Sequence, residues 1–143
     1  MNKTDFTNKL KEIFDSNKIG TMATIREDKP MSRYMTFYND GLTLYTYTTK
    51  DTYKIEDLEK NPYAHILLGY EESTDKSERF VEILGKAKLP EDVTPDVDET
   101  LAKIGQTYQK LKGNDNLQAI EIEIETAKIM NDDETEAETV DLT

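Results

Sequence analysis

The sequence contains no cysteine, no tryptophan and a single histidine, His65. Without cysteine there are no disulfide bonds, no thiolate metal ligands and no cysteine nucleophile. A single histidine without cysteine also argues against a zinc or copper centre, because such sites take several nitrogen or sulfur ligands. A histidine buried in an apolar strand pattern is more often a core or interface residue than a catalytic one, and we interpret His65 in that way. No metal site is predicted.

Long apolar runs are also missing. No segment approaches the ~18 apolar residues of a membrane-spanning helix, and the polar, periodic N-terminus lacks the apolar centre of a signal peptide. The 143 residues carry 30 acidic and 18 basic side chains, which gives a net charge of −12. This charge opposes general binding to nucleic acids and to anionic membranes. The sequence therefore predicts a single soluble, cytoplasmic domain with no nucleic-acid or membrane partner.

The charge is nevertheless unevenly distributed. Between residues 18 and 54, six basic side chains stand against four acidic ones, a local balance of +2. The basic residues are Lys18, Arg26, Lys29, Arg33, Lys50 and Lys54. A small anion would find its most favourable electrostatic field in this part of the chain.

The segment LTLYTYTTKDTYK (42–54) lies at the centre of that region. It joins an alternating strand pattern to a cluster of threonines, two lysines and the start of a helix, with Thr48, Thr49, Thr52 and Lys54 as candidate ligands. Hydroxyls, a cation and helix N–H groups together can hold a phosphate. Threonine also favours strands and caps, and lysine favours surfaces, so the cluster has an equally good structural explanation.

Arg33 is a second candidate. In the strand predicted at 31–38 it alternates onto the same face as Met35 and Phe37. A guanidinium group on an apolar face needs an anionic partner or a route to the rim of the sheet. A carboxylate of the protein would satisfy it, and so would a bound anion. If this strand pairs with the strand at 42–49, Arg33 joins the hydroxyl cluster and the bound anion is favoured.

Hydrophobic periodicity predicts three helices and six strands. The helices are expected at 4–16, at 52–60 and from residue 94 to about 111, and the strands at 19–26, 31–38, 42–49, 63–70, 79–89 and 118–130. The first three strands form a predicted meander, with NDG (39–41) as a hairpin turn. The strand at 63–70 is nearly continuously apolar and is expected to be central, and a bulge or a bend is expected at Gly85.

Six mostly antiparallel strands predict a mainly β (α+β) fold, a closed or partly closed barrel with peripheral helices. Closure removes the exposed edges that an open sheet must protect. Residues 1–130 make up the predicted domain. Residues 131–143 contain six acidic side chains and no basic one. That composition predicts a disordered, solubilising tail.

Four stretches carry a resemblance to a known family: GTMATI (20–25), KPMSRYMTF (29–37), LTLYTYTTKDTYKIEDLEKNPYAHILL (42–68) and FVEILGKAKL (80–89). With the order of elements, they resemble the general stress protein 26 branch of the pyridoxamine 5'-phosphate oxidase-like FMN-binding split barrels. The resemblance covers about residues 8 to 130. It implies a six-stranded antiparallel split β-barrel.

Members of that family form homodimers that bind FMN at the subunit interface. The resemblance implies that Arg33 contacts the phosphate or the ribityl chain of FMN, and that the backbone around Met35 lines the isoalloxazine ring. It further implies that Thr48 and Thr49 hydrogen-bond the flavin and its ribityl portion.

Thr52 and Lys54 are implied to hold the phosphate at the start of the helix. The chain also departs from the family. Relatives commonly have arginine where Tyr53 stands, and members that oxidise vitamin B6 carry a C-terminal, often arginine-rich motif for the substrate phosphate. Here the C-terminal strand and tail are acidic and their only cation is Lys128. A true vitamin B6 phosphate oxidase is therefore disfavoured.

The resulting hypothesis is an FMN-binding flavoprotein, a flavin-dependent oxidoreductase of unknown substrate with a connection to stress. The absence of an evident catalytic acid or base agrees with it, since the cofactor would perform the chemistry. One alternative is a non-enzymatic flavin carrier or sensor. Another is a degenerate split barrel that has lost its cofactor. Deazaflavin and haem, which some related barrels bind, remain alternative ligands.

Overall fold

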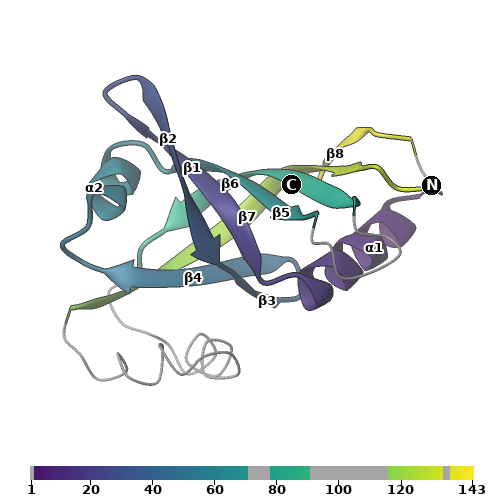
Figure 1. The fold of residues 1–143 in the computed structure, drawn as a ribbon, viewed down its shortest axis with the longest axis horizontal. Helices are drawn as coiled ribbons and strands as arrows, with labels where there is room; N and C mark the ends of the chain where they lie inside the picture. The colour runs from purple at the N-terminus through teal and green to yellow at the C-terminus, as the bar shows by residue number, and fades with distance from the viewer. Residues whose placement is uncertain (1, 71–77, 91–115, 134–135) are drawn as a thin grey trace.

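The computed structural model describes residues 2–70, 78–90, 116–133 and 136–143. These residues form two helices and eight strands (Figure 1). The helices are α1 (Lys3–Ser16) and α2 (Tyr53–Lys60). The strands are β1 (Ile19–Arg26), β2 (Lys29–Thr36), β3 (Tyr38–Asp40), β4 (Thr43–Thr49), β5 (Tyr63–Gly69), β6 (Phe80–Lys88), β7 (Leu117–Met130) and β8 (Thr139–Asp141). The helix predicted from residue 94 lies outside the described residues.

All eight strands belong to one antiparallel sheet with the order β2-β1-β5-β6-β7-β4-β3, and β8 pairs with β7. The sheet curls until β2 and β4 approach each other without forming a ladder. There the Thr46 hydroxyl donates a hydrogen bond of 2.8 Å to the backbone carbonyl of Thr36. The mainly β, antiparallel split-barrel fold with peripheral helices is confirmed. Six predicted strands became eight because the segment predicted as one strand at 31–38 divides between β2 and β3, and because the acidic C-terminal segment contains β8.

The predicted meander of the first three strands is wrong at Phe37. The segment 31–38 does not continue as one strand into the NDG hairpin, because it divides into β2, which pairs with β1, and β3, which pairs with β4. The backbone N–H of Phe37 bonds the carbonyl of Lys18 at 2.6 Å, and the ring is buried. Phe37 therefore fixes the point where the chain passes from one end of the sheet to the other.

The core lies between the inner face of the sheet and α1. α1 buries one face, made of Phe6, Leu10, Ile13 and Phe14. Ile120, Ile122 and Ile124 of β7 point into the core. Burial of such side chains is the main stabilising term of the fold. Neither helix in the described part of the chain is long and apolar enough to cross a membrane.

The sequence predicts a bulge or bend at Gly85, and the ladder between β6 and β7 is irregular at this residue, with the extra residue in β7. The register with β7 shifts between Leu84 and Gly85, so that Glu125 of β7 has no partner in this ladder. A Cβ atom on Gly85 would lie 2.6 Å from Cγ2 of Ile122, which is closer than real contacts allow. Glycine therefore lets the two strands approach at the bend.

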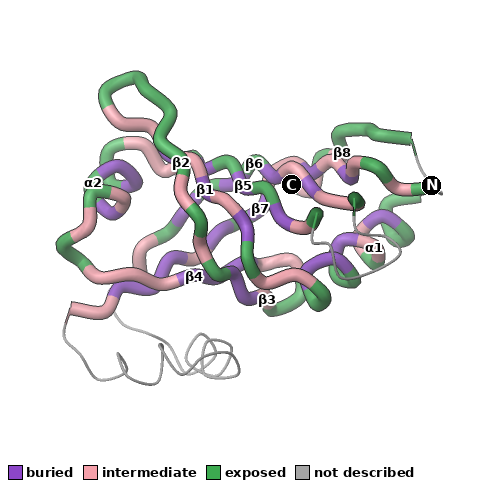
Figure 2. The backbone as a smooth tube through the Cα atoms, viewed as in Figure 1, coloured by how far each residue is buried: buried purple, intermediate pink, exposed green. Residues whose placement is uncertain are grey.

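Burial differs from expectation in two segments. The strand at 63–70 was predicted to be central, and β5 does lie within the sheet between β1 and β6. Burial nevertheless alternates along it (Figure 2): Tyr63, His65 and Leu67 are exposed, so His65 is not buried as the apolar pattern suggested. Residues 131–143 were expected to be a disordered tail, whereas β8 pairs with β7 and both Val140 and Leu142 pack against the core. In both cases the overall composition hid a period of two.

Candidate functional site

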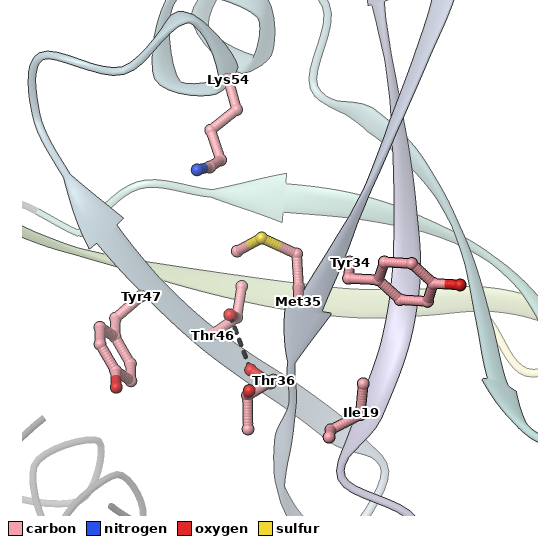
Figure 3. A pocket seen from close by; sticks show the side chains of 7 residues that line it. All are labelled: Ile19, Tyr34, Met35, Thr36, Thr46, Tyr47 and Lys54. Carbon is pink, nitrogen blue, oxygen red and sulfur yellow. Dashed lines mark hydrogen bonds between the residues drawn. The ribbon is translucent and has the colours of Figure 1, made fainter. Parts of the chain in front are cut away.

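A polar pocket of about 280 Å³ lies where β2, β4 and the start of α2 meet (Figure 3). Lys54, the second residue of α2, directs its ammonium group towards Met35 of β2 and Thr46 of β4 (Figure 3). The pocket is lined by Ile19, Tyr34, Met35, Thr36, Thr46, Tyr47 and Lys54. The strand-to-helix junction predicted from the sequence is thus the location of a pocket that contains a lysine.

The predicted threonines are arranged differently from expectation. Thr52 is the N-cap residue of α2, but its side chain does not cap the helix, and its hydroxyl donates a 3.1 Å hydrogen bond back to the carbonyl of Thr49. The Thr49 hydroxyl bonds Asp51 at 2.6 Å. Thr48 does not line the pocket, whereas Thr46 does. The pocket therefore meets β4 further from the strand end than the sequence suggested.

Arg33 lies two residues before Met35, on the same face of β2. Its NH1 group donates hydrogen bonds to the carbonyl of Met22 at 3.2 Å and to the hydroxyl of Thr24 at 2.9 Å. Its NH2 group lies 3.9 Å from Oδ2 of Asp57. The apolar face predicted for Arg33 is thus completed by a buried carboxylate of the protein, at the outer limit of ion-pair distance.

Asp57 is the central charged group, and sequence reasoning did not identify it. The residue is 4% exposed. The Nε and NH2 atoms of Arg26 donate to its two oxygens, each at 3.1 Å, and the Thr24 hydroxyl donates to Oδ2 at 3.2 Å. The hydrogen bonds from Arg26, more than any other contact, lower the pKa of Asp57, so it remains charged at neutral pH.

The charges around the pocket do not cancel. Arg26, Arg33 and Lys54 contribute three positive charges and Asp57 one negative charge, which leaves +2. Burial, and after it the positive charge of Arg33, lower the pKa of Lys54. Burial also lowers the pKa of Arg33. An anion between Lys54 and Arg33 would relieve this repulsion, and a phosphate monoester carries about −1.5 to −2 charges at pH 7.

The residues that were missed carry a weak sequence signal. Asp57 follows Lys54 by three residues, so the two lie on neighbouring positions of one helix face. Arg26 ends β1, and its guanidinium lies over the ring of Tyr53 at 4.8 Å from the centroid. Arg26 and Asp57 meet only because α2 packs against β1, and local sequence patterns do not predict that packing.

The polar side chains that line the pocket are better suited to binding an anion than to acid–base catalysis. The pocket lining contains one lysine, two threonines and two tyrosines, and no carboxylate or histidine. Within the described ranges, no group of three or more His, Cys, Asp or Glu residues could hold a metal ion. Lys54 could hold a phosphate in this pocket, next to the apolar side chains of Met35 and Ile19, whereas Arg33 does not line it.

Comparison with known proteins places the chain in a family. Residues 6–131 match the family described as pyridoxamine 5'-phosphate oxidase. The chain is 40% identical to General stress protein 26 of Bacillus subtilis over 131 residues, 92% of each protein. The crystal structure of General Stress Protein 26 from Bacillus anthracis superposes with a TM-score of 0.74 at 27% identity and covers 96% of this chain and 98% of that one.

A more distant structure shares the fold alone. An FAD-binding protein from Mesorhizobium loti superposes with a TM-score of 0.69 at 16% identity, covering 84% of this chain and 90% of that one. The resemblance of the sequence to the general stress protein 26 branch is confirmed by the first two relatives. The chain belongs to the pyridoxamine 5'-phosphate oxidase family.

Proposed function

We propose that this protein binds FMN through its phosphate at the Arg33–Lys54 cluster and acts as a flavin-dependent oxidoreductase. The observation that carries the proposal is the +2 balance of three cations and one carboxylate beside the pocket. This positive charge would balance the charge of one phosphate dianion. Family membership and the similarity to general stress protein 26 support the same ligand and a connection to stress.

Each side chain has a role in this proposal. Lys54 and Arg33 would bind the phosphate oxygens, and the apolar side chain of Met35 and the ring of Tyr47 would line the organic part of the ligand. Thr49 and Thr52 would contribute hydroxyls only after exchanging their present partners, Asp51 and the carbonyl of Thr49. Thr48 would have to reach the ligand from outside the pocket lining. When bound, FMN supplies hydride or electron transfer at its ring system, and the protein supplies position and electrostatics.

The polar pocket is too small to enclose the whole nucleotide. Its volume of about 280 Å³ lies just below the range of about 300–1,000 Å³ that small-molecule pockets occupy. Ile19 and Tyr34 line it, and they also line an adjoining apolar hollow of about 640 Å³ on the outer face of the sheet. The flavin ring would therefore extend towards that outer face, where a second subunit would cover it.

The outer face of β1, β2 and β5 has the character of a self-association surface. Strand pairing places eleven residues on it: Ile19, Thr21, Ala23, Ile25, Pro30, Ser32, Tyr34, Thr36, Tyr63, His65 and Leu67. None is acidic, lysine or arginine, in a chain with a net charge of −12. Two copies of so acidic a chain would repel each other least through this face.

Exposure on the same face is high. Tyr34 is 81% exposed, Ile19 57% and Tyr63 43%, and β2 is an edge strand of the sheet. Exposed apolar patches and unprotected edges mark interaction sites. We therefore include in the proposal a homodimer that associates through the outer face and completes the FMN site.

A visible spectrum of freshly purified protein tests the ligand. The expected result is a flavin spectrum, and denaturation should release a molecule with the mass of FMN. Release of FAD, a deazaflavin or haem would contradict the FMN assignment. A colourless protein that binds no FMN on addition would contradict flavin binding altogether and leave a barrel without a cofactor.

Anaerobic mixing of the flavin-bound protein with NADH or NADPH tests the reaction. Bleaching of the flavin absorbance followed by reoxidation in air is expected for an oxidoreductase. A flavin that stays oxidised with both reductants would contradict the oxidoreductase and indicate a flavin carrier or sensor.

A further inference from the structure

A buried carboxylate beside a proposed phosphate site requires an explanation. The side chain of Asp57 is 5% exposed, and it lies one helical turn from Lys54 on α2. Its negative charge opposes the binding of an anion nearby. Its contacts with Arg26, Thr24 and Arg33 indicate what it contributes in return.

Asp57 contacts the two arginines at different distances. Arg26 approaches with two donors at 3.1 Å each, one to each oxygen of the carboxylate. Arg33 stays 3.9 Å from Oδ2. The charge of Asp57 is therefore cancelled mainly by Arg26, and the charge of Arg33 remains available.

Thr24 connects Asp57 to Arg33. The hydroxyl of this buried residue donates to Oδ2 of Asp57 at 3.2 Å and accepts from NH1 of Arg33 at 2.9 Å. Because a hydroxyl has one proton, donation to Asp57 turns its lone pairs towards Arg33. Among the described residues, Arg33 donates hydrogen bonds only through NH1. Its NH2 group faces Oδ2 of Asp57 at 3.9 Å, and the N–H of its Nε atom is left to donate to a ligand.

We propose that Asp57 is a positioning residue of the phosphate site: acting through Thr24, it fixes the guanidinium of Arg33 by its NH1 group and leaves Nε to bind the ligand. This inference rests on the proposed FMN site and adds a residue to it. Arg26 serves in this arrangement to neutralise Asp57. The carboxylate thus aids anion binding by geometry, although its charge opposes it.

The Asp57→Asn variant separates geometry from charge. Removal of a negative charge alone would tighten anion binding, whereas loss of positioning would weaken it. We expect the affinity for FMN to fall about tenfold, and the affinity for riboflavin, which lacks the phosphate, to stay unchanged. Glu56→Gln is the matched control: it removes the same charge from the neighbouring residue of α2, whose side chain is 60% exposed. Its affinity for FMN should equal or slightly exceed that of the wild type.

The Thr24→Val variant tests the hydrogen-bonded connection from Asp57 through Thr24 to Arg33. It also serves as the test if the Asp57→Asn variant does not fold. It keeps the shape of the side chain and removes the hydroxyl, so we expect about a fivefold loss of FMN affinity. Because both residues act on Arg33 by one route, the double variant should lose no more than Asp57→Asn alone. Independent, additive losses would contradict the proposed route.

Unchanged or tighter FMN binding by the folded Asp57→Asn variant would overturn the inference. So would wild-type affinity in Thr24→Val. Failure of the FMN site itself gives a different result: the wild-type protein would then bind FMN no better than riboflavin, or bind neither.

Discussion

Two side-chain nitrogens of Arg26 each lie 3.1 Å from an oxygen of Asp57, and this ion pair joins the end of β1 to α2. Arg26 remains one-third exposed, with a side-chain exposure of 34%, while Asp57 is almost completely enclosed. Loss of one member of such a pair leaves the other uncompensated, and a buried partner makes that costly. Asp57 is therefore expected to contribute to the stability of the fold as well as to the proposed site.

The pH dependence of stability should change in Asp57→Asn. Hydrogen bonds from Arg26 lower the pKa of Asp57 in the folded protein, below the value of about 3.9 expected for the unfolded chain. Its stabilisation is then complete above about pH 5 and is lost as the pH falls through 3.9 towards the lower folded pKa. We expect the variant to be less stable by about 1–3 kcal/mol at pH 7, with allowance for the exposure of Arg26.

Urea unfolding between pH 7 and pH 3 measures this effect. The difference in unfolding free energy between wild type and Asp57→Asn should stay constant down to about pH 5 and shrink below pH 4. A difference that grows on acidification would show that the sign of the pKa shift is wrong.

Lys54→Met should weaken FMN binding by about 1–3 kcal/mol, because it removes one charge-assisted contact while keeping an unbranched side chain. Riboflavin should bind as before. Fluorescence quenching of the free flavin during titration gives both constants. Lys11→Met, an exposed change on α1 that removes the same charge, is the control, and it should not alter either constant.

Gly20 and Gly41 should respond differently to alanine. A Cβ atom on Gly20 would overlap the backbone carbonyl oxygen of Leu67 in the adjacent strand, so Gly20→Ala should destabilise the fold by about 2–3 kcal/mol. Gly41 has φ +58° and open space around it, so only the backbone strain of about 1 kcal/mol applies. Equal losses in thermal unfolding of the two variants would contradict the close approach of β1 and β5.

Leu67→Glu should weaken self-association. The residue lies on the uncharged outer face, 38% exposed, opposite Thr21 of β1. A carboxylate there would be buried without a partner in the proposed dimer, at a cost of several kcal/mol. Sedimentation velocity of the wild type should give a dimer, and the variant should shift to monomer. Asn8→Glu, which adds the same charge at an exposed position of α1, should remain dimeric.

Much of the fold could be predicted because its signals are local. The amphipathic α1, the alternation in β7 and the bulge at Gly85 each follow from side-chain periodicity or backbone freedom within a few residues. The C-terminal strand β8 was missed because acidic composition outweighed the alternation of Val140 and Leu142. The division of one predicted strand at Phe37 was missed because it depends on which strands pair.

The candidate site was also predicted only in part, where its signals are local. Lys54 and Met35 were predicted, and both line the pocket. Arg33 was predicted as a cation on an apolar face, and the carboxylate near it proved to be Asp57. The triad of Thr24, Arg26 and Asp57 could not be predicted, since its members come from β1 and α2 and meet only after folding. Thr48 and Thr49 were predicted as hydroxyls at the end of the strand, whereas Thr46 and Tyr47, further from that end of β4, line the pocket.

The most direct test is the affinity of the apo-protein for FMN compared with riboflavin, measured by equilibrium titration at low ionic strength. A site built around the charges of Arg33 and Lys54 should bind FMN at least about a hundredfold more tightly than riboflavin, since two charge-assisted contacts depend on the phosphate. The preference should diminish as salt is added. Equal affinities for the two flavins, at any salt concentration, would contradict the phosphate site.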